Sequence, residues 1–86
     1  MDINNLIAIV KKKIDNNIEI QKIEIQDKSF LHKNHSSYQE EKFHLKLIIN
    51  SDALKKLNRI ESNKKIYKIL NVEIKEYIHS LQILIR

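Results

Sequence analysis

The chain contains neither glycine nor proline in its 86 residues. Glycine supplies the left-handed backbone of tight turns, and proline fixes turns and interrupts helices, so this chain has to reverse direction without either. Its turns are therefore expected to use Asn, Asp and Ser, whose side chains bond to neighbouring backbone. The glycine-rich loops of P-loop and dinucleotide-binding sites are excluded for the same reason.

The length and composition favour one small globular domain. Charged residues make up 31% of the chain and apolar residues 42%, a balance typical of a folded protein rather than a disordered segment. We therefore expect a single domain over residues 1–86. The chain has no cysteine, which excludes disulfides, thiolate nucleophiles and an iron–sulfur cluster held by four thiolates of its own.

The sequence shows no targeting peptide or membrane span. The stretch MDINNLIAIVKKK has its acid first and its lysines last, the reverse of a secretory signal. No apolar run approaches the ~20 residues that cross a bilayer. We expect a soluble protein that is not bound to membranes, cytoplasmic in a bacterium and cytosolic or mitochondrial in a eukaryote.

Apolar residues recur with a helical period near the amino terminus. Asp2 can cap a helix that ends near residues 15–17. Ile23 and Ile25 then alternate as in a short strand. Residues 28–41 show no apolar period and are predicted to form a loop, much longer than the ~5-residue norm. The apolar stripe of the helix consists of Ile3, Leu6, Ile7, Val10 and Ile14.

The second half of the chain alternates more strongly. Apolar residues at every second position of 43–49 give the clearest strand signal in the sequence. Ser51 or Asp52 can cap one or two helical turns. A longer helix is expected from about 62 to 76, and a final strand over 79–85.

This order of elements predicts an α+β fold of two layers, α-β-β-α-α-β, with a three-stranded mixed sheet covered by helices on one side. The two strands that flank the long loop should pair antiparallel. The last strand follows a helical crossover, so it should lie parallel to the second.

Four motifs are shared with a known family. They are HKNH (32–35), FHLKLIINSDAL (43–54), SNKKIYKIL (62–70) and IHSLQI (78–83). In this order and at these separations they resemble the motifs of BolA-like proteins, whose class II KH-like fold is the one predicted above. The resemblance extends over residues 29–85, about two thirds of the chain. The chain departs from the family at Ser62, Asn63 and Lys64, where the pattern has Arg-His-Arg, and at Lys56, where it has Gly.

The resemblance implies a role in iron–sulfur trafficking or iron homeostasis. In BolA-like proteins the His of the terminal motif and a His or Cys of the long loop ligate a [2Fe–2S] cluster shared with a monothiol glutaredoxin. The cysteine of the glutaredoxin and its bound glutathione supply the other ligands. Carried over, the ligands are His79 and His35, with His32 as the other loop candidate. The isolated chain should be a monomer without a cofactor, and a heterodimer with its partner.

A partner that shares the cluster should meet a partly apolar surface with a basic rim. We expect Tyr67 and Leu84 to supply the apolar surroundings of His79, and Lys64 and Lys65 to supply the rim.

The residues alone leave alternatives open. His79 has the parity of Leu81 and Ile83, so it can be a structural residue packed on the rim of the core. The loop histidines can simply be solvated, because two His three residues apart are a weak metal signal. His44 has the parity opposite to Leu45, which predicts that it faces solvent or covers the sheet edge rather than binding metal.

The second hypothesis is nucleic-acid binding, as a transcriptional or stress regulator. The net charge is +5 and the pI about 9.5, which suits phosphate contacts. Against it, KH domains grip the backbone with a glycine loop that this chain lacks. No motif places a nucleophile beside a base, so no enzymatic activity is expected. The candidate phosphate contacts are Lys55, Lys56, Arg59, Lys64, Lys65 and Lys68.

Overall fold

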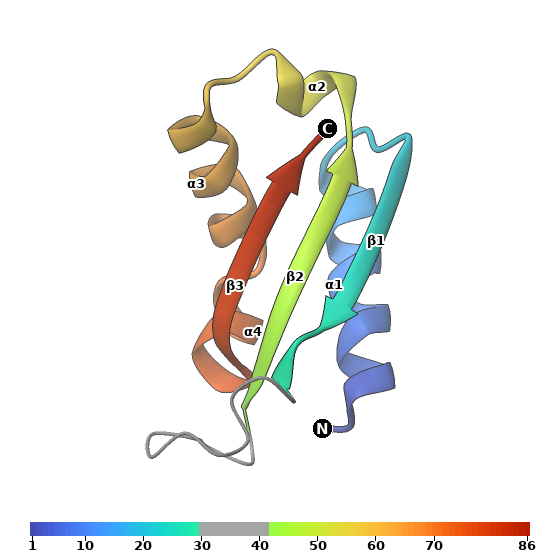
Figure 1. The fold of residues 1–86 in the computed structure, drawn as a ribbon, viewed down its shortest axis with the longest axis vertical. Coiled ribbons are helices and arrows are strands. Elements are labelled where there is room, and N and C mark those ends of the chain that lie inside the picture. Colours follow the sequence, from blue (N-terminus) through green and yellow to red (C-terminus); the bar gives the residue numbers. More distant parts are fainter. Residues whose placement is uncertain (30–41) are drawn as a thin grey trace.

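The structure is a computed structural model that describes residues 1–29 and 42–86, and it consists of a mixed sheet with helices on one face (Figure 1). Most of the segment that was predicted to be a loop, residues 30–41 with His32 and His35, lies outside the described residues. The elements are α1 (Ile3–Asn17), β1 (Lys22–Asp27), β2 (Phe43–Asn50), α2 (Asp52–Lys55), α3 (Arg59–Ile69), α4 (Asn71–Glu76) and β3 (Ile78–Ile85).

The sheet has the predicted topology. The strand order is β1-β2-β3, with β1 antiparallel and β3 parallel to the central β2. Figure 1 shows α1 behind β1 and β2, and α3 alongside β3. The predicted α+β fold is therefore confirmed, including the parallel pairing that the helical crossover requires.

The core lies between the sheet and the helices. Leu45, Leu47 and Ile49 project from one face of β2 and are almost completely buried. Leu47 is paired with Ile25 of β1 and Ile83 of β3, so the inward faces of all three strands are in register. The helices complete the core with Leu6, Val10 and Ile14 from α1 and Ile66 from α3.

Three helices begin with a side-chain cap, as expected for a chain without glycine. The carboxylate of Asp2 accepts from Asn5 N at 2.9 Å, and Ser51 Oγ accepts from Leu54 N at 3.2 Å. Asn58 caps α3 through the N–H of Glu61 at 2.8 Å. No residue in the described part of the chain has positive φ. The turns there therefore need no left-handed backbone.

The helix predicted over 62–76 is wrong in two respects. It begins at Arg59, because the side chain of Asn58 accepts from the N–H of Glu61 and so caps the helix three residues before the predicted start. It is also divided at Leu70, where φ is −97° and ψ is 19°. The division turns α4 so that the carboxylate of Glu73 meets Lys13 of α1, with Lys13 Nζ at 2.9 and 2.7 Å from its two oxygens. This long-range contact has no local sequence signal.

We expect the two halves of this ion pair to differ in their effect on stability. The side chain of Glu73 is 7% exposed, whereas that of Lys13 is 38% exposed. Lys13→Ala should lower the free energy of unfolding by ~2 kcal/mol, because it leaves a nearly buried carboxylate unpaired. Glu73→Gln should cost roughly half as much, since Lys13 can turn to water. Urea denaturation of both variants measures the difference, and equal losses would contradict this explanation.

Candidate functional site

His79 is placed by an irregularity at the start of β3. The register pairs Phe43 with Ile78 but His44 with Ser80, so His79 is an extra residue on β3, as in a β-bulge. The bulge shifts the alternation by one position. Ile78 is therefore buried, at 3% exposure, and Leu81 still packs against the core. His79 is left exposed, although its parity with Leu81 alone would have directed it to the core face.

His44 lies next to His79, on the sheet face opposite the helices. The centroids of the two rings are 4.8 Å apart and the rings are tilted by 41°. His44 Nδ1 lies 2.6 Å from Ser80 Oγ. His44 is only 6% exposed, so of its two predicted placements, facing solvent or covering the sheet edge, the first is wrong. The alternation of residues along β2 correctly predicted that His44 lies on the face opposite the core. Alternation could not show that His44 is covered there.

The backbone around this pair is held at several points. His44 N–H donates to Ser29 Oγ at 3.0 Å, and His44 C=O accepts from Lys28 N at 2.7 Å. Phe43 N–H donates to Tyr77 O at 2.8 Å, which joins the start of β2 to the end of α4. The described residues on both sides of segment 30–41 therefore lie at the same end of the sheet as His79.

The described residues cannot hold a metal centre by themselves. Within residues 1–29 and 42–86, no group of three or more His, Cys, Asp or Glu side chains is arranged to bind a metal ion. An iron–sulfur cluster of the common types has four protein ligands. His79 is an accessible imidazole of the type that binds iron in Rieske centres, so the donor set suits one side of a shared cluster.

The predicted partner-binding residues lie on the surface formed by α3 and β3. Tyr67 is 42% exposed and Leu84 37% exposed, and both line a depression of about 320 Å³. Tyr67 Oη donates to Leu81 O at 3.1 Å. Lys64 and Lys65 are exposed on α3. The structure thus brings Tyr67 and Leu84 together, but Leu84 is five residues along β3 from His79, about 16 Å away at the usual strand rise.

The six candidate phosphate contacts are all exposed and lie on α2, on α3 or between them. This surface meets the carboxyl-terminal end of β3, the end opposite His79 (Figure 1). Lys55 has an acidic neighbour, with its Nζ 3.8 Å from Asp52 Oδ1. The two functional hypotheses therefore share Lys64 and Lys65 on α3, and they differ in that one also needs His79 at the start of β3 and the other Lys55 and Lys56 near the opposite end of that strand. No helix in the described part is long and apolar enough to pass through a bilayer.

Comparisons with known proteins agree with this fold. The sequence profile of the BolA-like protein family matches residues 14–86. The DNA-binding transcriptional regulator BolA of Haemophilus influenzae is 32% identical over 73 residues, which cover 85% of this chain and 68% of that protein. The BolA domain of SufE1 from Arabidopsis thaliana superposes with a TM-score of 0.78 at 26% identity, covering 92% of this chain and 87% of that one. BolA1 of the same plant gives a TM-score of 0.79 at 22% identity, over 94% and 89% of the two chains, a likeness of fold alone.

Proposed function

The chain belongs to the BolA-like protein family, and from that premise we propose that it shares a [2Fe–2S] cluster with a monothiol glutaredoxin, in iron–sulfur trafficking or iron regulation. The observation that carries the proposal is His79, an exposed imidazole at a β-bulge beside a buried second histidine. The proposed role is not enzymatic.

The chain's own contribution is a positioned imidazole. Ile78 on one side and Leu81 on the other pack into the core, so the backbone that carries His79 is fixed. The ring of His44 lies against that of His79, and His44 is itself bonded through Nδ1 to Ser80 Oγ. His35 or His32 would provide the second ligand of this chain, and the glutaredoxin cysteine and glutathione the rest.

The direct experiment is anaerobic co-expression with a monothiol glutaredoxin, followed by visible absorption and circular dichroism of the purified complex. We expect a heterodimer with a cluster spectrum that differs from that of the glutaredoxin alone. The chain expressed by itself should carry no cluster. A complex whose spectrum equals that of the glutaredoxin homodimer would reject the proposal.

Lys64 and Lys65 are proposed to steer an acidic partner toward the surface formed by α3 and β3. The double variant Lys64→Glu/Lys65→Glu should slow association by about tenfold at low ionic strength, with little effect on the cluster spectrum. Stopped-flow mixing measures the rate. The matched control is Lys11→Glu/Lys12→Glu, which makes the same charge change on exposed lysines of α1. Equal slowing by both variants, or an altered spectrum, would argue against a steering role.

Nucleic-acid binding is a second candidate, supported by the name of the Haemophilus influenzae relative and by the six exposed cations of α2 and α3. If phosphate contacts carry it, fluorescence anisotropy with duplex DNA should show an affinity that falls steeply with salt. The double variant Lys64→Glu/Lys65→Glu should reduce the slope of log K for binding against the logarithm of the salt concentration by roughly 1.8, because two phosphate contacts are lost and each contributes roughly 0.9. Lack of binding at low salt would remove this candidate.

A further inference from the structure

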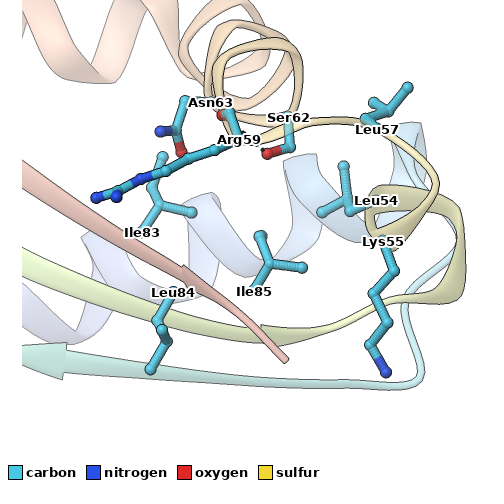
Figure 2. Close-up of a pocket in the computed structure, with 9 residues that line it drawn as sticks. All are labelled: Leu54, Lys55, Leu57, Arg59, Ser62, Asn63, Ile83, Leu84 and Ile85. Atoms are coloured by element: carbon cyan, nitrogen blue, oxygen red, sulfur yellow. Dashed lines mark hydrogen bonds between the residues drawn. The ribbon is translucent and has the colours of Figure 1, made fainter.

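A groove lies beside the carboxyl-terminal half of β3, where the α2–α3 region approaches the strand (Figure 2). Its volume is about 470 Å³. Arg59, Asn63, Ile83 and Leu84 line both this groove and the depression at Tyr67, so the two are continuous along β3. We call the combined feature the β3 groove.

The outer edge of β3 offers backbone groups to this groove. Arg86 N–H donates inward to Ile49 O at 2.8 Å, whereas Leu81 O points outward and accepts from Tyr67 Oη. Successive residues of a strand direct their peptide groups to opposite edges. Ile83 and Ile85 therefore direct their N–H and C=O groups away from β2. In the described part of the chain, β3 is the last strand at this side of the sheet.

The side chains around this edge are apolar on both faces of the strand. Figure 2 shows Ile83 near Arg59 and Asn63 of α3, Ile85 near Leu54, and Leu84 directed to the other side. Leu84 is 37% exposed. A strand added at this edge would therefore find apolar contacts for alternate residues on either face.

The polar lining has one sign of charge. Lys46, Lys55 and Arg59 contribute to the walls of the β3 groove, and no Asp or Glu is among the described residues that line it. Arg59 reaches across the groove above Ile83 in Figure 2. Lys46 is paired with Gln82 on the opposite sheet face. Positively charged side chains thus lie on both faces of the sheet beside the outer edge of β3.

We propose that the β3 groove binds an extended acidic segment of a partner protein, which adds to β3 as a fourth strand. Backbone pairing with Ile83 and Ile85 would supply the affinity, and the three cations would select acidic sequences. The lining of the groove begins at Leu81, about 7 Å along β3 from His79 at the usual strand rise. The proposal does not depend on the shared cluster.

Two other occupants are less well matched to this surface. A second copy of the chain would bring two sets of the same cations together, which opposes edge-to-edge pairing. Single-stranded nucleic acid usually needs aromatic platforms on which its bases stack. Tyr67 is the one aromatic residue in the described lining, and its hydroxyl is bonded to Leu81 O.

The test uses the chain without a cluster and a synthetic twelve-residue peptide of alternating Glu and Val. Titration monitored by amide chemical shifts should move Ile83 and Ile85 most. Two further peptides carry N-methyl groups on their backbone nitrogens, one at the odd-numbered residues and the other at the even-numbered residues. Both keep the charge of the parent peptide, so a difference between them reports backbone pairing rather than charge attraction. We expect one register to weaken binding about tenfold and the other to leave it nearly unchanged, since a strand pairs along one edge only.

Matched variants test the charge selection. Arg59→Glu should weaken peptide binding several-fold, whereas Lys75→Glu, the same change on exposed α4, should not. The proposal is overturned if the peptide does not bind at millimolar concentration, or if both N-methylated registers bind equally. It is also overturned if oligothymidylate shifts Ile83 and Ile85 and the peptide does not, or if the chain dimerises through β3 and excludes the peptide.

Discussion

His79→Ala should leave the domain folded and abolish the shared cluster. His79 is the exposed extra residue of the bulge, and its neighbours Ile78 and Leu81 hold the strand in the core without it. An exposed substitution of this kind ordinarily changes the free energy of unfolding by about 0.5 kcal/mol or less. Loss of a ligand, in contrast, should remove or replace the cluster spectrum of the heterodimer.

The measurement compares thermal midpoints of the isolated variants with the absorption and circular dichroism of their complexes. Glu24→Ala is the matched control, because Glu24 is also an exposed strand residue but lies on β1, away from the predicted partner surface. An unfolded His79→Ala protein would make His79 structural, and an unchanged spectrum would refute the ligand assignment. His35→Ala and His32→Ala are then compared in the same way. The residue whose replacement also alters the cluster spectrum is the second ligand.

Leu47→Ala should cause the largest loss of stability. Leu47 is fully buried at the centre of the central strand, between Ile25 and Ile83 on the neighbouring strands. Deleting its side chain leaves a cavity that two paired strands cannot collapse to fill, and such changes cost ~3 kcal/mol. Small domains have only about 5–15 kcal/mol in total, so Tm should fall by roughly 15 °C.

Ile48→Ala is the control for this prediction. Ile48 is the next residue of β2 and points to the face without helices, where it is only half-buried. Its replacement should cost clearly less than that of Leu47. Calorimetry measures the two values of Tm. Equal losses of Tm would contradict the prediction, because they would mean that burial of Leu47 in the core does not set its contribution to stability.

The strands and their faces could be read from the sequence because each depends on a local pattern. Alternation over 43–49 predicted the central strand, and Asp2 and Ser51 predicted two helix starts, since a cap bonds to backbone three residues away. The same reasoning could have found Asn58. The parallel crossover followed from chain connectivity, which allows few arrangements of a strand, a helix and a second strand.

The site depended on contacts that no local pattern contains. The bulge that frees His79 is a mismatch between β2 and β3, more than thirty residues apart in sequence, and parity within β3 alone pointed to the core. His44 likewise contacts Ser80 and His79 of the neighbouring strand β3, and the division of α3 from α4 accompanies an ion pair with α1. Sequence therefore determined the type and order of the main elements and which family the motifs resemble, because periodicity and capping act over a few residues. Only the tertiary structure decided which side chains meet at the sheet edge and along the β3 groove, because register and packing are set between distant segments.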